Sequence, residues 1–225
     1  MSNSSKSSDN FFNSGPSNTF SRVIWWNGGG KIVSRITSNP VLLNLINNYK
    51  PDIFVYGEAQ IITPHEINLN GYTCFIHSSK PLTVDNFRRG LVVFFLEKHK
   101  YKLTKVYASK IYDIIWVRME NPNKAVYFCF FCSPGAHYPL PARAKFYEIF
   151  SAKFSYFGSV GTVYLLGDTN ARLGPLLEDR NIHGKYIMNS NTPLLNEFLE
   201  MTGLTILNKV FCQGFPTYRT NPAWC

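Results

Sequence analysis

The stretch Pro51-Asp52-Ile53-Phe54-Val55-Tyr56-Gly57-Glu58 holds a short hydrophobic run between a proline and a Gly-Glu pair. A run of this length is typical of a buried strand, because helices need longer segments. The proline also ends any preceding helix, since its ring blocks helix continuation. We therefore predict a buried strand at residues 53–56, followed directly by the acidic side chain of Glu58.

The residues before this strand predict a second strand and a helix. Residues 22–26 form a β-like run that ends at Asn27 and three glycines. Asn39-Pro40 then supplies an N-cap and a proline in the first helical turn, and residues 40–49 place apolar side chains along one stripe. The first part of the chain is therefore predicted to form strand, helix and strand.

The rest of the chain mixes strands and helices. β-rich runs at residues 72–76, 91–96, 103–107, 111–119 and 125–132 predict an antiparallel meander. Aromatic residues at helical spacing around residues 146–154 predict a helix, and a strand at residues 162–166 leads into Gly167-Asp168. A last helix at residues 193–201 and a short strand at 204–207 follow. This pattern favours an α+β fold in which helices cover sheets.

Polar side chains follow several of the predicted strands. They are Asn27, Glu58, Asp168 and Asn170. Layered sheets assemble sites at strand ends, and the two-residue spacing puts Asp168 and Asn170 on one side of an extended chain. A carboxylate can orient water, an amide can donate to a phosphate oxygen, and Glu58 suits Mg²⁺. Taken singly, a polar turn or a solvated strand end explains each residue as well.

Three blocks carry a family resemblance when they are taken in order. They are Ile24-Trp25-Trp26-Asn27-Gly28, the stretch from Pro51 through Glu58 to Ala59, and Leu166-Gly167-Asp168-Thr169-Asn170-Ala171. Together they resemble the endonuclease/exonuclease/phosphatase family. Arg89-Gly90-Leu91-Val92-Val93, Ile115-Trp116-Val117 and Pro216-Thr217-Tyr218 resemble strands of non-LTR retrotransposon endonucleases in particular. The resemblance implies a four-layer α/β/β/α sandwich of two mixed β-sheets with outer helices.

The resemblance also implies an activity and a set of roles. It implies that the chain nicks duplex DNA by Mg²⁺-dependent hydrolysis, with Mn²⁺ as an alternative metal. Asn27 and Glu58 would hold the metal, Asp168 would activate water, and Asn170 would bind the phosphate. His137, Tyr138 and Arg89 are further candidates for substrate contacts. A reverse transcriptase domain is expected in the full polyprotein, and an intracellular, nuclear location follows.

Two departures from the family pattern matter. Cys132 stands where the family has a tyrosine, and a thiol is a poorer hydrogen-bond donor than a phenol. The family's Ser-x-Ile-Asp strand and final Asp-His pair have no match before Cys225. We therefore expect residues 20–225 to be one domain that lacks its C-terminal catalytic segment. The alternatives are an inactive remnant that can still bind DNA and a phosphatase acting on a small substrate.

The composition of the chain bears on these interpretations of its function. The chain has 23 Lys and Arg against 14 Asp and Glu, a net charge of +9, which either a polyanionic partner or an AT-biased gene explains. Arg88-Arg89 and residues 98–105 are the best candidates for phosphate contacts, and a solvated strand face explains them equally well. Five cysteines without a secretory signal favour a reducing compartment, and no apolar run suits a membrane span. Residues 1–19, rich in Ser and Asn, are predicted to be a disordered leader.

Some suggestive patterns have simpler explanations. Cys129 and Cys132 match a zinc spacing, but residues three apart on a strand face opposite sides, so buried core thiols are expected. Gly28-Gly29-Gly30-Lys31 lacks the full phosphate-loop pattern and is predicted to be a turn. Most aromatic residues such as Trp25, Trp26 and Trp116 are expected in the core rather than stacked on bases.

Overall fold

The computed structural model describes residues 22–30, 39–61, 67–78, 90–98, 101–120, 124–176, 180, 183–207 and 210. The predicted leader at residues 1–19 lies outside these ranges, as do Arg89 and residues 211–225. The elements in chain order are β1 (Val23–Asn27), α1 (Pro40–Tyr49), β2 (Ile53–Gly57), β3 (Tyr72–Ser78), β4 (Gly90–Leu96), β5 (Leu103–Ala108), β6 (Asp113–Met119), β7 (Val126–Cys132), α2 (Leu140–Val160), β8 (Thr162–Asp168), the 3₁₀ turn η4 (Gly174–Leu176) and α3 (Thr192–Thr202).

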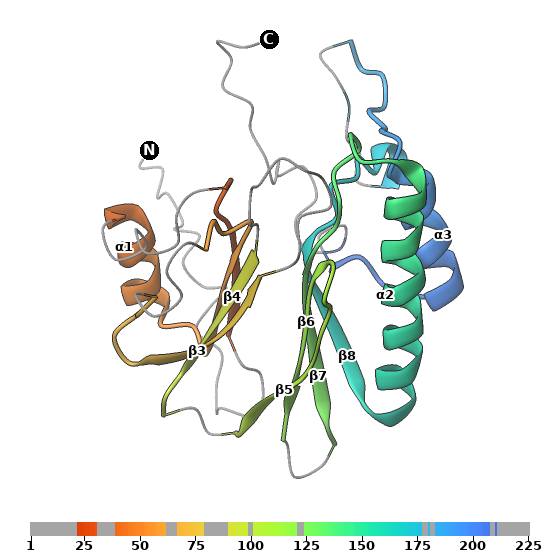
Figure 1. Cartoon of the computed structure of the whole chain (residues 1–225). Coiled ribbons are helices and arrows are strands. Elements are labelled where there is room, and N and C mark those ends of the chain that lie inside the picture. The colour runs from red at the N-terminus through yellow and green to blue at the C-terminus, as the bar shows by residue number, and fades with distance from the viewer. Residues whose placement is uncertain are drawn as a thin grey trace, which may run out of the picture.

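The described strands form two four-stranded sheets with the orders β1-β2-β4-β3 and β5-β6-β7-β8. Each sheet is mixed, because β1 and β2 run parallel, as do β7 and β8, while the other neighbours run antiparallel. The sheets lie face to face, with α1 outside the first and α2 and α3 outside the second (Figure 1). The expected four-layer α/β/β/α sandwich is confirmed.

Strand β2 shows why the hydrophobic runs are continuous. Ile53 and Val55 belong to the apolar layer between the sheets, whereas Phe54 and Tyr56 pack with Leu42 and the rest of the cluster under α1. Successive side chains of a strand point to opposite faces, and here both faces are covered. The helix itself begins as predicted, since Asn39 Oδ1 accepts hydrogen bonds from the backbone N–H groups of Val41 and Leu42.

The outer face of the second sheet packs against aromatic side chains of α2 and α3. Trp116 is fully buried, and its ring stacks on Phe157 of α2 with centroids 4.5 Å apart. Cys129 belongs to this outer layer and Cys132 to the layer between the sheets, so the two thiols face opposite sides as predicted. Burial raises the pKa of Cys129 well above its usual value. This thiol is therefore a structural core group.

Two expectations about strands are wrong. The predicted meander is divided, because β3 and β4 belong to the first sheet and β5, β6 and β7 to the second. Alternating side chains reveal a strand but carry no information about which sheet it joins. Residues 204–207 do not form a strand; Leu204 and Ile206 instead pack against the α2–α3 layer.

The parallel pairs place functional candidates at one end of the sandwich. Asn27 at the end of β1 pairs with Gly57 at the end of β2, and Cys132 at the end of β7 pairs with Asp168 at the end of β8. Carboxyl ends of parallel strands share one edge of a sheet, which is where open sheets bind ligands. In the described part of the chain, no helix is long and apolar enough to cross a membrane.

Gly167 is required by close approach between strands. A Cβ built on Gly167 would lie 2.0 Å from the backbone oxygen of Phe131 on β7. We expect Gly167→Ala to force β8 away from β7 and to lower the free energy of unfolding by about 1–3 kcal/mol. Chemical denaturation measures this change.

Gly158→Ala is the matched control for that measurement. Gly158 lies in α2, and a Cβ built there meets no atom within 4 Å. Alanine in a helix interior should raise the free energy of unfolding by roughly 0.5–1 kcal/mol. Equal effects of the two substitutions would contradict the close approach of β7 and β8.

Candidate functional site

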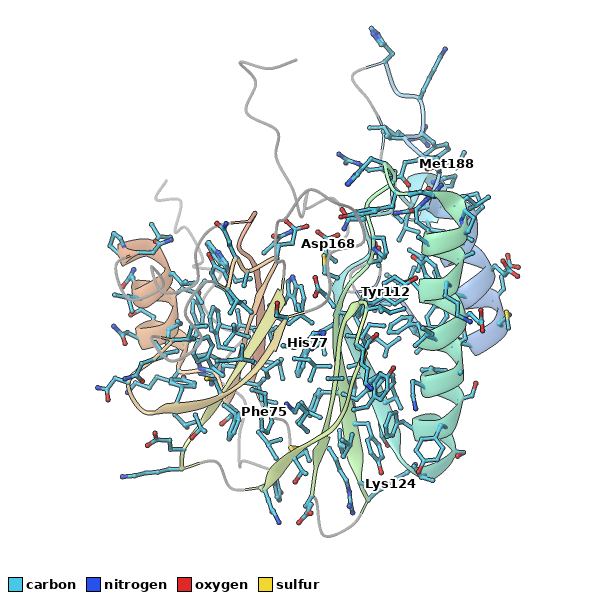
Figure 2. All side chains as sticks on the ribbon, viewed as in Figure 1. Phe75, His77, Tyr112, Lys124, Asp168 and Met188 are labelled. Carbon is cyan, nitrogen blue, oxygen red and sulfur yellow. The ribbon has the colours of Figure 1, made fainter. Side chains whose placement is uncertain are left out.

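A hydrogen bond joins the two sheets at the ends of their parallel strands. Asn27 Nδ2 on β1 donates to Asp168 Oδ2 on β8 over 2.9 Å. The backbone N–H of Gly29 donates to Asn27 Oδ1 over 2.8 Å, which fixes the orientation of the amide. Asp168 lies at one end of the sandwich, and Lys124 lies at the other (Figure 2). The carboxylate of Asp168 is thus held at the shared strand edge.

The glycine segment after β1 is tied to the end of β2. Gly28 N–H donates to Gly57 O over 2.8 Å, and Gly30 N–H donates to Glu58 O over 3.0 Å. A Cβ on Gly28 would lie 2.2 Å from the ring of Tyr56, so only glycine fits at this position. The turn predicted here is confirmed. It holds Asn27 beside the residue that follows β2.

Glu58 sits in a sharp bend directly after β2. Its φ of 49° is in the left-handed region, which is uncommon for a residue with a side chain. Cys132 Sγ on β7 lies 3.6 Å from Glu58 Oε1, within reach of a weak S–H donor. Glu58 from the first sheet and Cys132 from the second therefore meet at the same end of the sandwich as Asp168.

Asn170 completes the cluster, but not in the extended conformation that was predicted. Its φ is 47°, and its backbone N–H donates to Asp168 Oδ1 over 2.8 Å. Asp and Asn side chains often form such a turn with the backbone two residues later. The side-chain Nδ2 of Asn170 donates to Ser133 O over 2.8 Å and lies 3.7 Å from Cys132 Sγ.

Asn27, Glu58, Asp168 and Asn170 therefore lie together, as predicted. One set of contacts runs from Asn27 through Asp168 to Asn170. The other runs from Glu58 through Cys132 to Asn170. The arrangement places two carboxylates and two amides around one point, where they can orient water and bind a polar ligand.

Among the described residues, the others predicted to contact substrate are not part of the hydrogen-bonded cluster of Asn27, Glu58, Asp168 and Asn170. His137 is exposed in the loop between β7 and α2, and its ring centroid is 4.3 Å from that of Tyr138. Tyr138 N–H donates to Gly135 O over 3.0 Å within the same loop. Arg89 lies outside the described residues. Lys102 and Lys105 lie toward the end of the second sheet that is opposite the site. Lys102 directly precedes β5 and Lys105 lies in it. This strand begins at Leu103, which pairs with Met119, and Met119 pairs with Val126 at the start of β7, whereas Cys132 is at the end of β7. This position argues against phosphate contacts by these lysines at the site.

Several residues at the site were not foreseen from the sequence. Asn189 Nδ2 and Asn191 Nδ2 both donate to Asn170 O over 2.9 Å. Arg143 on α2 donates in turn to Asn191 Oδ1 over 2.8 Å. The signal that the sequence offers is the run of polar residues before the last helix, and this run does not by itself indicate contact with Asn170.

Tyr147 of α2 lies close to this group. Burial raises the pKa of its phenol to about 12, and the neighbouring Ser133 and the charge of Arg143 act in the opposite direction. At neutral pH the phenol therefore stays protonated, and it does not serve as a base.

The oxygen donors of the cluster suit a hard cation. Among the described residues no group of three or more His, Cys, Asp and Glu side chains could by itself hold a metal ion. A Mg²⁺ ion needs no such cage, because it usually binds one or two carboxylates together with water and substrate phosphate. Glu58, Asp168 and the Asn27 amide oxygen fit that chemistry.

Comparisons with known proteins give a match in structure only. No protein-family model and no curated protein matches the sequence. The AP endonuclease LMAP from Leishmania major superposes with a TM-score of 0.66 and 13% identity, over 88% of this chain and 72% of that one. The endonuclease domain of TRAS1, a telomere-specific non-LTR retrotransposon, gives a TM-score of 0.56 and 15% identity, over 83% and 73%.

The chain has the endonuclease/exonuclease/phosphatase fold. The resemblance stated from the sequence is thereby confirmed at the level of fold. The two sheets of this endonuclease/exonuclease/phosphatase sandwich meet through Asn27 and Asp168 at the ends of their parallel pairs.

The Asn27–Asp168 contact predicts the behaviour of Asn27→Asp. The substitution replaces the N–H donor by a second carboxylate at hydrogen-bonding distance from Asp168. Like charges disfavour joint ionisation, so folding raises the pKa for the second ionisation of the pair above its value in the unfolded chain. The variant should therefore lose stability relative to the wild type as the pH rises toward 7 and the second carboxyl is forced to ionise.

Thermal unfolding between pH 4 and 8 tests this prediction. Asn48→Asp is the matched control, because Asn48 is exposed on α1 and its side chain donates to the neighbouring Asn44 Oδ1. A destabilisation of Asn27→Asp that does not change with pH would contradict the proximity of the two carboxylates.

Proposed function

We propose that this chain is a metal-dependent phosphodiesterase domain that nicks duplex DNA. The observation that carries the proposal is the meeting of Asn27, Glu58, Asp168 and Asn170, contributed by both sheets, at one end of the sandwich. The fold is also that of an AP endonuclease and of a retrotransposon endonuclease domain, which supports the same reaction class.

Glu58 and the amide oxygen of Asn27 would hold Mg²⁺, or Mn²⁺ in its place. The bound ion would neutralise charge that develops on the phosphate oxygens during hydrolysis. Glu58 is presented by the bend after β2, and Asn27 is oriented by the N–H of Gly29. Both ligands are therefore set by backbone geometry before any substrate arrives, which lowers the reorganisation needed during the reaction.

Asp168 would orient the attacking water and accept its proton. Its two carboxylate oxygens accept hydrogen bonds from Asn27 Nδ2 and from the backbone N–H of Asn170, which fixes the plane of the group. A carboxyl oxygen has more than one acceptor site, so a water molecule can bind beside these donors. A fixed base close to its water contributes strongly to rate, because orientation is settled in advance.

Asn170 would bind the scissile phosphate. One N–H of its amide is directed to Ser133 O, and the amide nitrogen also lies 3.7 Å from Cys132 Sγ. Sulfur is a weak acceptor, so a phosphate oxygen would displace this second contact and gain a stronger hydrogen bond. His137 and Tyr138 of the loop between β7 and α2, and Arg89, are proposed as further substrate contacts.

The biological setting is proposed from the same resemblance. The domain, residues 20–225, would nick target DNA in the nucleus so that a reverse transcriptase elsewhere in the polyprotein can prime there. A phosphatase acting on a small phosphorylated substrate and an inactive remnant that still binds DNA remain the alternatives. Duplex DNA as the partner predicts an affinity that falls steeply with salt, whereas a small substrate does not.

Nicking of supercoiled plasmid in Mg²⁺ tests the activity. We expect Glu58→Gln and Asp168→Asn to reduce the nicking rate by about 10²-fold or more, because each removes charge stabilisation or the base. Glu148→Gln is the control, since Glu148 is exposed on α2 and pairs with Lys145 away from the site. Equal activity in Glu58→Gln and wild type would sink the proposed roles.

The same assay should be run on the chain joined to any sequence that its gene encodes beyond Cys225. The family pattern calls for a later Asp-His pair, and a general acid of this kind contributes about 10²–10⁴-fold. Nicking that appears only in the longer form would support the expectation that the 225-residue chain lacks this segment. The absence of nicking in both forms would favour the alternatives.

Thermal stability tests the metal independently of activity. A ligand that binds only the folded state raises the unfolding free energy, by about 2.7 kcal/mol at a hundred times its Kd. We expect Mg²⁺ or Mn²⁺ to raise the melting temperature of the wild type and of Glu148→Gln, but not that of Glu58→Gln. A similar rise in all three proteins would mean that the metal binds elsewhere.

A further inference from the structure

Arg143 is a buried cation next to the proposed site. Only 6% of its surface is exposed, although it is the fourth residue of α2, at the end of the first turn. Its Nε donates to Tyr138 O over 2.9 Å, and its Nη1 donates to Ser190 O over 2.7 Å and to Asn191 Oδ1 over 2.8 Å. One guanidinium group thus connects α2, the loop after β7 and the turn before α3.

Asn191 links Arg143 to the site by hydrogen bonds. It is 1% exposed, and its Nδ2 donates to Asn170 O and to Pro134 O, each over 2.9 Å. A guanidinium group only donates hydrogen bonds, so Arg143 requires the Asn191 side chain to turn its oxygen toward α2. The nitrogen of the amide is thereby directed to the backbone oxygens of Asn170 and Pro134.

These hydrogen bonds end at Asn170, which has an unfavourable backbone conformation. Asn170 has a φ of 47°, and its carbonyl oxygen accepts hydrogen bonds from both Asn189 Nδ2 and Asn191 Nδ2. Non-glycine residues in this region are held there by their surroundings and cluster at functional sites. Two amide donors on one carbonyl fix the plane of the peptide that follows Asn170, and with it the direction of its side chain.

The aromatic packing of α2 does not require this polar network. Phe146 and Phe150 are fully buried and already join α2 to the second sheet through Phe131. A buried charge costs several kcal/mol of desolvation, which its hydrogen bonds must offset. The hydrogen bonds of Arg143 go to the loop after β7 and to the turn before α3 rather than to the second sheet, which points to a role other than anchoring the helix.

We propose that Arg143 and Asn191 are positioning residues that hold the Asn170 side-chain amide in the orientation needed to bind a phosphate oxygen. The inference rests on the proposed function, because it deepens the role assigned to Asn170. Arg143 sets the orientation of the Asn191 amide, Asn191 holds the carbonyl of Asn170, and the side chain of Asn170 points to Ser133 O and Cys132 Sγ. Neither Arg143 nor Asn191 touches the substrate.

Asn191→Asp separates positioning from packing. The side chain keeps its shape and its acceptor for Arg143, but it loses the donor to Asn170 O and Pro134 O. We expect nicking of supercoiled plasmid to fall about 10–100-fold, as when supporting residues of a site are removed. In an Asn170→Gly background, which removes the side chain and tolerates a positive φ, the same substitution should have little further effect.

Two controls exclude other causes. Asn48→Asp makes the same chemical change at an exposed position of α1 and should leave nicking unchanged. Leu195→Ala removes a buried apolar side chain of α3 that belongs to the core cluster, so we expect it to lower the melting temperature while leaving the hydrogen-bonding groups around Asn170 in place. Leu195→Ala should nick at close to the wild-type rate well below its melting temperature.

A second readout needs no activity. In ¹⁵N-labelled protein, the side-chain amide signals of Asn170 are assigned by their loss in Asn170→Gly. Asn191→Asp should shift or broaden these signals, and Asn48→Asp should not. If neither the wild-type chain nor its longer form nicks, the proposed function fails, while the amide signals still decide whether Asn191 positions Asn170.

The inference is overturned by either of two results. The first is an Asn170 amide signal that Asn191→Asp leaves unchanged. The second, in an active protein, is a loss of nicking that is fully additive with Asn170→Gly or no larger than that of Leu195→Ala. Non-additive loss together with a shifted amide signal is the result that the inference expects.

Discussion

The hydrogen bond from Asn27 to Asp168 is the contact on which the site depends. It joins two sheets whose facing layer is mostly apolar, and it does so where a parallel strand pair of each sheet ends. Apolar packing holds the two sheets together, but it is not directional and does not by itself fix the position of one sheet along the other. The polar contact at this edge fixes one carboxylate opposite the residues that follow β1 and β2.

The rest of the site is built by backbone rather than by long side chains. Glu58 and Asn170 both occupy the left-handed region, and Gly28 and Gly167 stand where a Cβ would collide with a neighbour. Such conformations cost free energy and persist only where surrounding packing enforces them. The aromatic layers on both sides of the sheets supply that packing. The geometry of the site therefore depends on the hydrophobic core.

The sequence predicts the local features of this arrangement well. A buried strand followed by a polar residue is visible in the chain itself, which is why Asn27, Glu58, Asp168 and Asn170 could be grouped. Contacts between distant segments are not visible in the same way. The Asn191–Asn170 hydrogen bond spans 21 positions and the Cys132–Glu58 contact spans 74, and nothing in local spacing encodes either. The division of the predicted meander between two sheets has the same cause, since a strand pattern does not specify its partner.

We propose that Glu58 and Asp168, from different sheets, form one metal and phosphate site. Crystals soaked with Mn²⁺ and a short DNA duplex, with the ion located by its anomalous scattering, test this proposal. We expect an ion bound to the Glu58 carboxylate, with a phosphate between it and the amide of Asn170. An ion bound away from Glu58, or a phosphate bound at another surface with this end of the sandwich empty, would mean that the two carboxylates do not form such a site.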